Sequence, residues 1–235
     1  MNYPIQFVSL GPGDPELITL KGFKQLQQAD IIYCPATEGR HGLTSRASEI
    51  VKALGIGECT IRPFTLPMSK ERTEAWKAYD TLYAATREEH LQGKRIVIVA
   101  EGDAGFYSSI QYIYDKLMES GIPVNRTAGI PAFIAAGALA GLHIVKQEEQ
   151  INVIPGTATK EELANKIETG TIIVLMKLPG CQDAIRESMR EYAGQAAFHY
   201  FENIGTDLEF YTSDPLLIQN RKFPYFSLMI IQPQN

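Results

Sequence analysis

Short apolar segments alternate with amphipathic segments along almost the whole chain, and this alternation limits the folds that the sequence can adopt. Several apolar segments, such as 95–100 and 171–176, are continuous runs of the kind found in strands buried on both faces. In segment 47–54, apolar residues recur three and four positions apart, which predicts a helix. Alternation of strands and helices predicts an α/β protein. The predicted strands are 5–10, 31–34, 95–100, 151–154, 171–176, 197–201 and 225–231.

Two helical patterns between these strands carry further signals. Thr159 and Glu162 have the spacing of a capping box, which predicts a helix start. Trp76, Tyr79 and Tyr83 mark a longer helix, and we interpret this aromatic stripe as core packing rather than as a binding surface.

Glycine and proline gather at one place in the middle of the chain, at Gly121, Pro123, Gly129 and Pro131. A length of 235 residues is enough for two domains of modest size. We therefore expect two α/β lobes, 1–122 and 123–235. Because clefts between lobes are preferred places for small-molecule sites, the cleft is the expected ligand site.

Composition excludes several functional classes. The formal net charge of −5 argues against general binding to nucleic acid or to an anionic membrane. No signal peptide and no apolar run of membrane-spanning length is recognisable, which predicts a soluble cytoplasmic protein. The three cysteines are far apart, as expected for reduced thiols. The histidines show no metal-ligand spacing, so no metal site is expected; they are His41, His90, His143 and His199.

The predicted strand 5–10 runs directly into Gly11-Pro12-Gly13-Asp14-Pro15. Glycine at a strand end lets the backbone turn sharply and approach a ligand closely, and open α/β sheets bind ligands at such ends. A dinucleotide fingerprint would need a third glycine where Glu16 stands. The prolines also remove amide donors that a pyrophosphate requires. We therefore predict a ligand loop that is not a phosphate loop, with a plain tight turn as the alternative.

Two further loops repeat the pattern. The predicted strand 95–100 leads into segment 101–109, which begins Glu101-Gly102-Asp103. The turn 128–132 opens a stretch of small residues, 135–141, which permits close approach to a ligand or to a neighbouring backbone. For this third turn, tight helix packing remains the alternative interpretation.

These loops in this order, with Met176 closing segment 171–176, resemble the tetrapyrrole methylase family over almost the whole chain, from Val8 to Ile231. The resemblance implies two α/β lobes with S-adenosylmethionine between them, usually in a homodimer. Within the family, the sequence is most similar to the precorrin-2 C-20 methyltransferases of cobalamin synthesis. That similarity is carried by segments 39–47, 101–109 and 225–228. The implied activity is methylation at C-20 of precorrin-2 or cobalt-precorrin-2, a small-molecule tetrapyrrole.

The resemblance also implies which residues hold the cofactor. This chain departs from the family at Ala104, where proline is usual, and at Pro131, where threonine or serine is common. We expect these departures to tune affinity more than reaction type. The implied cofactor-binding residues are Pro12, Glu101, Gly102, Asp103, Phe106, Pro131, Ala132, Met176 and Asn203.

Asp103 is the first candidate for a chemically active carboxylate and Asp14 the second, although aspartate in a loop commonly caps its own backbone. A basic rim formed by Arg40, Arg46 and Arg62 would pair with substrate carboxylates, with solvated surface charge as the alternative. Cobalt is expected only inside the substrate, which His41 would then be able to approach. The predicted substrate-binding residues are Gly11, Gly13, Asp14, Arg40 and Arg46.

Three other functions stay open. The chain could methylate another ring position or uroporphyrinogen III. A distant relative of the fold acts on ribosomal RNA or a translation factor, which the acidic composition disfavours. A non-catalytic module that binds S-adenosylmethionine or a tetrapyrrole is the third alternative.

Overall fold

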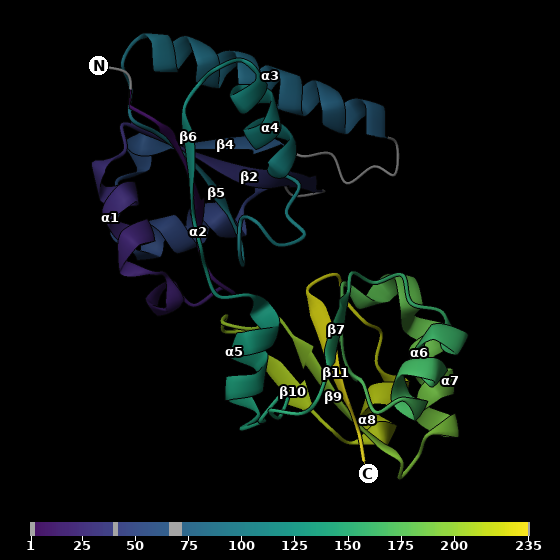
Figure 1. Ribbon diagram of the computed structural model, residues 1–235. Helices are drawn as coiled ribbons and strands as arrows, with labels where there is room; N and C mark the ends of the chain where they lie inside the picture. The colour runs from purple at the N-terminus through teal and green to yellow at the C-terminus, as the bar shows by residue number, and fades with distance from the viewer. Residues whose placement is uncertain (1–2, 40–41, 66–71, 235) are drawn as a thin grey trace. The chain divides into compact units, whose positions relative to one another are not determined.

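The computed structural model describes residues 3–39, 42–65 and 72–234. The chain divides into two compact units, Met1–Pro131 and Ala132–Asn235. Each unit contains one sheet with helices packed on it, which confirms the predicted α/β class (Figure 1). In the described part of the chain, no helix is long and apolar enough to cross a membrane.

The first unit is built on a six-stranded sheet in the order β3-β2-β5-β1-β6, with β4 also paired to β2. All pairs are parallel except β2 with β3. The strands are β1 (Ile5–Ser9), β2 (Ile31–Gly39), β3 (Gly42–Thr44), β4 (Ile61–Thr65), β5 (Ile96–Ala100) and β6 (Val124–Thr127), and the helices are α1 (Leu20–Gln28), α2 (Arg46–Ala53), α3 (Arg72–Leu91) and α4 (Gln111–Glu119).

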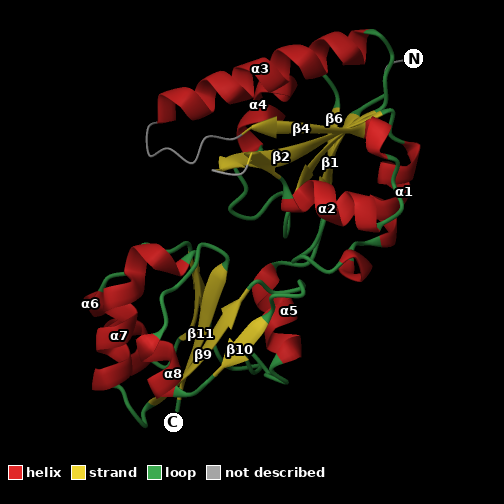
Figure 2. Cartoon of the chain, turned by 180° about the vertical axis from the view of Figure 1, so that it is seen from behind, coloured by secondary structure: helices red, strands yellow, loops and turns green. Residues whose placement is uncertain are grey.

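Helices cover both faces of this sheet, which explains the unbroken apolar run of β5 (Figure 2). Ile96 and Ile98 pack in the core that includes residues of α3 and α4. Val97 and Val99 point the other way, into the core that includes residues of α1 and α2. Burying one such side chain contributes about 1.5–3 kcal/mol, so both faces of β5 stabilise the unit.

β6 belongs to the first unit, although the expected boundary lay before it, after residue 122. It pairs in parallel with β1 from Ile5 opposite Val124 to Val8 opposite Thr127. The glycines and prolines between 121 and 131 therefore surround an internal strand, and the compact unit continues to Pro131.

The second unit contains a five-stranded sheet in the order β10-β9-β11-β8-β7. β7 and β8 are parallel, whereas β11 runs antiparallel to both β8 and β9. The predicted capping box is confirmed, because Thr159 and Glu162 cap the start of α6 reciprocally. The strands are β7 (Ile151–Ile154), β8 (Ile172–Met176), β9 (Ala196–Glu202), β10 (Phe210–Thr212) and β11 (Ser227–Pro233), and the helices are α5 (Ala132–Leu139), α6 (Lys160–Glu168), α7 (Gln182–Glu191) and α8 (Pro215–Asn220).

Candidate functional site

Three loops follow three neighbouring parallel strands of the first unit, β5, β1 and β6. Because parallel strands end at the same edge of a sheet, the loops predicted from sequence are brought together. Gly11 and Gly102 are joined by two backbone hydrogen bonds, Gly11 N to Gly102 O at 3.1 Å and Gly102 N to Gly11 O at 2.6 Å. Both glycines have positive φ, and a Cβ added to Gly102 would meet nothing within 4 Å. The Gly102 backbone is thus open to close approach by a ligand.

Ser9, the last residue of β1, connects the three segments and was not singled out from the sequence. Its fully buried hydroxyl donates to Thr127 O at 2.6 Å and accepts from Ala104 N at 2.8 Å. The sequence signal that could have identified Ser9 is a polar residue at the end of an apolar strand. The third turn packs on it so closely that a Cβ on Gly129 would lie 2.4 Å from Ser9 Cβ and 2.7 Å from Gly102 O. Only glycine fits there without a shift of the loops.

Asp103 connects the second loop to the third turn. Its Oδ1 accepts from Gly105 N at 2.8 Å and its Oδ2 from Gly129 N at 2.7 Å. Hydrogen bonds to an ionised acceptor are stronger than neutral ones. The carboxylate therefore holds two loops in register as well as capping its own.

The first loop is compact and buried. Pro12 and Gly13 are buried, and Asp14 Oδ1 accepts from Glu16 N at 2.8 Å. This bond begins the 3-10 turn Pro15–Leu17, so Asp14 acts as a cap. The ring of each proline fixes its φ, so the backbone of this loop is restricted.

Glu101 is the other carboxylate of this cluster. It lies 3.4 Å from the Nε of Arg46, at the start of α2, and its side chain is 26% exposed. Burial raises the pKa of Glu101 above its ordinary value; the Arg46 guanidinium opposes this rise, and Glu49 adds to it.

Glu101→Gln is expected to change the pH dependence of stability. The fold raises the pKa of Glu101, so the folded state favours the protonated carboxyl over the carboxylate. The stability that protonated Glu101 contributes to the wild-type fold is therefore lost as the pH rises through the folded pKa. The unfolding free energy of the variant, relative to wild type, should therefore increase as the pH rises above the ordinary pKa of glutamate, about 4.3. Urea unfolding at several pH values measures this; a pH-independent difference between the two proteins would contradict it.

The predicted basic rim is only partly assembled. Arg40, like His41, lies outside the described residues. Arg62 pairs with Glu89, which also accepts from Tyr33 Oη at 2.8 Å. Burial, followed by the bond to Glu89, raises the pKa of Tyr33 to about 12. The charge of Arg62 is thus paired with a carboxylate of the first unit. Of the predicted rim, Arg46 remains, and it lies beside Glu101.

In the second unit, the ends of β8 and β9 meet the start of β11. Lys177 follows Met176 with φ of 60°, and Asn203 follows β9 with φ of 49°. Lys177 N donates to Ser227 O at 3.0 Å and Asn203 N to Phe226 O at 2.9 Å. Left-handed residues other than glycine are uncommon and gather at functional sites. Met176 and Asn203 are therefore held at one edge of this sheet.

Two further features of this edge were not predicted. A Cβ on Gly156, after β7, would lie 2.4 Å from Lys177 O and 2.8 Å from Met176 O, so this turn packs tightly against the end of β8. Tyr225 is 46% exposed, and Lys177 Nζ lies 5.8 Å from the centre of its ring.

The remaining predicted residues lie at exposed or half-exposed positions. Phe106 is half-buried and its ring meets that of Tyr107 edge-on, with centroids 4.8 Å apart. Pro131 ends the first unit and Ala132 begins α5. Within the described ranges, no group of three or more His, Cys, Asp or Glu is arranged to hold a metal ion.

Comparison with known proteins agrees with this arrangement. Residues 4–216 match the family of Tetrapyrrole (Corrin/Porphyrin) Methylases. The chain is 31% identical over 232 residues to a precorrin-2 C(20)-methyltransferase from Sinorhizobium sp, covering 95% of this chain and 93% of that protein. It is 27% identical over 251 residues to a cobalt-precorrin-2 C(20)-methyltransferase from Salmonella typhimurium, covering 100% and 98%.

Solved structures show the same fold. A cobalt precorrin-4 methyltransferase superposes with a TM-score of 0.72 at 16% identity, covering 97% of this chain and 94% of that one. A uroporphyrin-III C-methyltransferase from Thermus thermophilus, complexed with S-adenosylhomocysteine, has a TM-score of 0.67 at 16% identity, covering 98% and 97%. With a family match over most of its length, this chain belongs to the tetrapyrrole (corrin/porphyrin) methylases.

Proposed function

We propose that this chain transfers a methyl group from S-adenosylmethionine to C-20 of precorrin-2 or cobalt-precorrin-2 in cobalamin biosynthesis. The observation that carries the proposal is the similarity, over nearly the full length of both chains, to two C(20)-methyltransferases. When bound, the donor supplies an electrophilic methyl group on a sulfonium.

The described residues fit such a donor. The open space beside Gly102 admits a ligand against the backbone, and Asp103 provides negative charge in the same loop for a cationic sulfonium. In the Gly11–Pro15 loop, two of the five residues are prolines without an amide donor, which disfavours a phosphate. We assign the donor to Pro12, Glu101, Gly102, Asp103, Phe106, Pro131, Ala132, Met176 and Asn203.

The protein groups act mainly by positioning. The Gly11–Gly102 bridge and the Asp103 bonds hold the loops rigid, and alignment of reactants can contribute about 7–11 kcal/mol. We assign Asp103 as a positioning residue on this basis. Glu101 Oε2 lies 3.4 Å from Arg46 Nε, and we assign the Glu101 carboxylate to take the proton released from C-20. Gly11, Gly13, Asp14, Arg40 and Arg46 are proposed to face the acceptor.

A turnover experiment tests the proposal. Purified protein is incubated with S-adenosylmethionine and precorrin-2, with and without inserted cobalt, and the product is examined by mass spectrometry and NMR. One added methyl group at C-20 is the expected result, and the two substrates establish the preferred metallation state. Methylation at another position would overturn the assignment. Calorimetric binding of S-adenosylhomocysteine without turnover would indicate a non-catalytic module.

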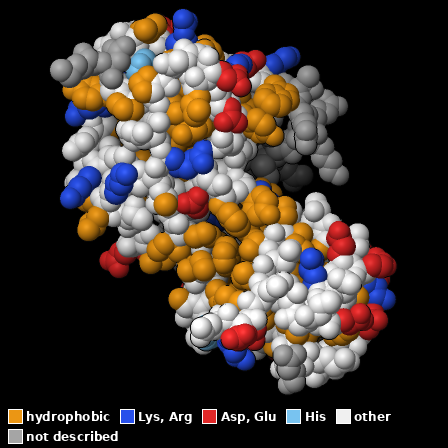
Figure 3. Space-filling view, in the orientation of Figure 1, with side chains coloured by type: hydrophobic (Ala, Val, Ile, Leu, Met, Phe, Trp, Pro, Cys, Tyr) orange, Lys and Arg blue, Asp and Glu red, His pale blue; other side chains and the backbone are white. Residues whose placement is uncertain are grey.

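We further propose that the enzyme is a cytoplasmic homodimer. The cysteines Cys34, Cys59 and Cys181 are unpaired, as is usual in a reducing compartment. Hydrophobic side chains gather over α5 (Figure 3), where Ile134 and Leu139 are 47% and 45% exposed. Exposed apolar patches commonly mark protein interfaces. Light scattering should give twice the chain mass, and a mass equal to one chain would contradict the proposal.

A further inference from the structure

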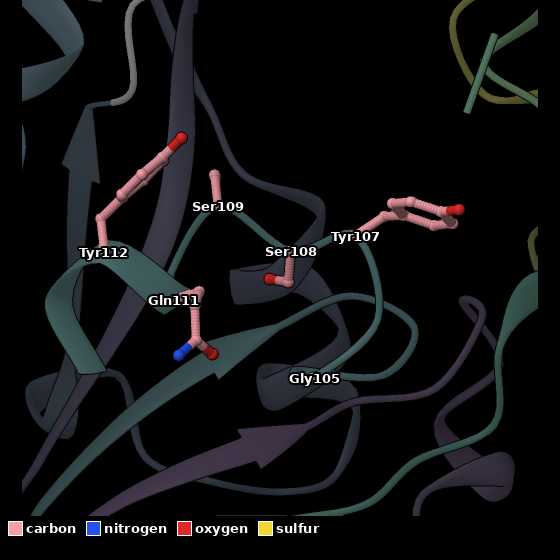
Figure 4. Close-up of a pocket in the computed structure, with 6 residues that line it drawn as sticks. All are labelled: Gly105, Tyr107, Ser108, Ser109, Gln111 and Tyr112. Atoms are coloured by element: carbon pink, nitrogen blue, oxygen red, sulfur yellow. The ribbon is translucent and has the colours of Figure 1, made fainter. Parts of the chain in front are cut away.

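The second loop and the start of α4 line an open pocket of about 480 Å³ (Figure 4). Its volume lies within the range of small-molecule sites. The pocket begins at Gly105, whose amide is bonded to Asp103, so it adjoins the loop assigned to the methyl donor. The lining residues are Gly105, Tyr107, Ser108, Ser109, Gln111 and Tyr112.

Two exposed aromatic rings flank the serines of this pocket. Figure 4 shows Ser108 and Ser109 between Tyr107 and Tyr112. Tyr107 and Tyr112 are 48% and 43% exposed. The Tyr112 ring is supported by Trp76, with centroids 4.6 Å apart, which orients it as a fixed wall. The Ser108 hydroxyl bonds to none of the described residues, so it is available to a ligand.

A cation, Arg126, lies next to two residues of the pocket lining, Gly105 and Gln111. Arg126, on β6, donates from Nη2 to Gln111 Oε1, and its Nη1 is 3.0 Å from where a Cβ on Gly105 would stand. Its guanidinium packs on the Tyr114 ring, 4.4 Å from the centroid. Among the described residues no carboxylate lies within ion-pair distance of Arg126, and its buried Nε has no hydrogen-bond partner. Asp103 Oδ1 is also near Gly105, but Asp103 already accepts from two backbone amides.

We propose that this pocket holds one pyrrole ring of the tetrapyrrole acceptor together with a carboxylate side chain of that ring. The flat ring would pack on Tyr112, and the carboxylate would bond to Ser108 on the side backed by Arg126. A partly buried cation without a carboxylate partner attracts an anion more strongly than a solvated one does. This inference rests on the proposed function, since an acceptor must lie beside the loop that holds its methyl donor.

The chain contains a single tryptophan, so Trp76, in contact with Tyr112, is a natural fluorescent reporter. Quenching by uroporphyrin, a stable tetrapyrrole with eight carboxylates, would measure the dissociation constant. Tyr112→Leu and Arg126→Gln are expected to raise it about fivefold to tenfold, because each removes an aromatic or ionic contact. Ser108→Ala should raise it about twofold to fivefold, as loss of one hydrogen bond does.

Conservative variants and matched controls separate binding from folding. Tyr112→Phe keeps the ring and should recover most of the affinity. Arg126→Lys keeps the charge but loses the stack on Tyr114, so it should recover only part of the affinity. Tyr3→Leu removes a similarly exposed tyrosine (51%), and Ser213→Ala an exposed serine of the second unit; neither should change the dissociation constant. The affinity for S-adenosylhomocysteine should stay within about twofold of wild type in all variants, which a disrupted loop would not permit.

Each outcome bears on one hypothesis. Unchanged uroporphyrin affinity in Tyr112→Leu and Arg126→Gln would overturn the pocket assignment, as would an equal loss of S-adenosylhomocysteine binding. If the variants lose affinity but wild type methylates neither form of precorrin-2, the pocket stands and the proposed function fails. Wild-type turnover with an unchanged KM in the pocket variants would reject the pocket alone.

Discussion

Gly129→Ala is expected to lower the free energy of unfolding by about 2–3 kcal/mol and to weaken binding of S-adenosylhomocysteine at least about tenfold. The added methyl group would lie 2.4 Å from Ser9 Cβ and 2.7 Å from Gly102 O, and neither is the end of a flexible side chain. Ser9 is fully buried, so relief of the contact must displace the second loop or the third turn. Denaturant unfolding and calorimetry measure the two effects.

Gly57→Ala is the matched control for this substitution. Gly57 also has negative φ, but its Cβ would meet only Cys59 Sγ at 3.8 Å, an ordinary contact. Alanine should be neutral there or stabilise by about 0.4–1 kcal/mol, because it restricts the unfolded chain. Equal stability of the Gly129 and Gly57 variants would show that the third turn is not packed as described.

Asp103→Asn is expected to weaken S-adenosylhomocysteine binding by about tenfold or more and to reduce kcat/KM by at least the same factor. Asparagine has one acceptor oxygen, whereas Asp103 accepts from Gly105 N and Gly129 N with two. Its amide nitrogen would face a backbone donor, and loss of a hydrogen bond to a charged acceptor costs about 1.5–3 kcal/mol. Wild-type affinity and kcat together would refute a role for Asp103 in the site.

Asp14→Asn supplies the comparison in the neighbouring loop. Asp14 accepts a single amide bond, from Glu16 N, and asparagine caps a helical turn about as well as aspartate does. Its stability and cofactor affinity should therefore stay near wild type. A loss as large as that of Asp103→Asn would mean that negative charge, rather than the bridge between loops, is what the site requires.

Local patterns predicted much of the fold. The apolar run of β5 and the capping box of α6 were recognisable because they depend on residues close together in sequence. The loops after β1 and β5 were recognised by their glycines. These glycines have positive φ, which glycine adopts at lower cost than other residues do. Short edge strands were missed; β10 has three residues, too few for a periodic signal.

Contacts between distant residues were not predictable in the same way. The interpretation of Trp76, Tyr79 and Tyr83 as core is correct for Tyr79, which is 6% exposed, and for Tyr83, which packs against the same core. Trp76 is 44% exposed and contacts Tyr112 beside the pocket. Arg62 was a candidate for substrate binding, but Glu89 engages it. No local sequence pattern indicated that Arg126 would bond to Gln111, because that contact depends on where β6 joins the sheet.

The sequence by itself determined the α/β class, the glycine loops and the family, because each depends on residue types at short spacing. Only the tertiary structure decided what the side chains of those loops do. Ser9 bonds to the end of β6, and Asp103 bonds to the third turn, because β5, β1 and β6 are neighbours in one parallel sheet. Strand order brings residues about a hundred positions apart within hydrogen-bonding distance, and no short-range pattern records that order.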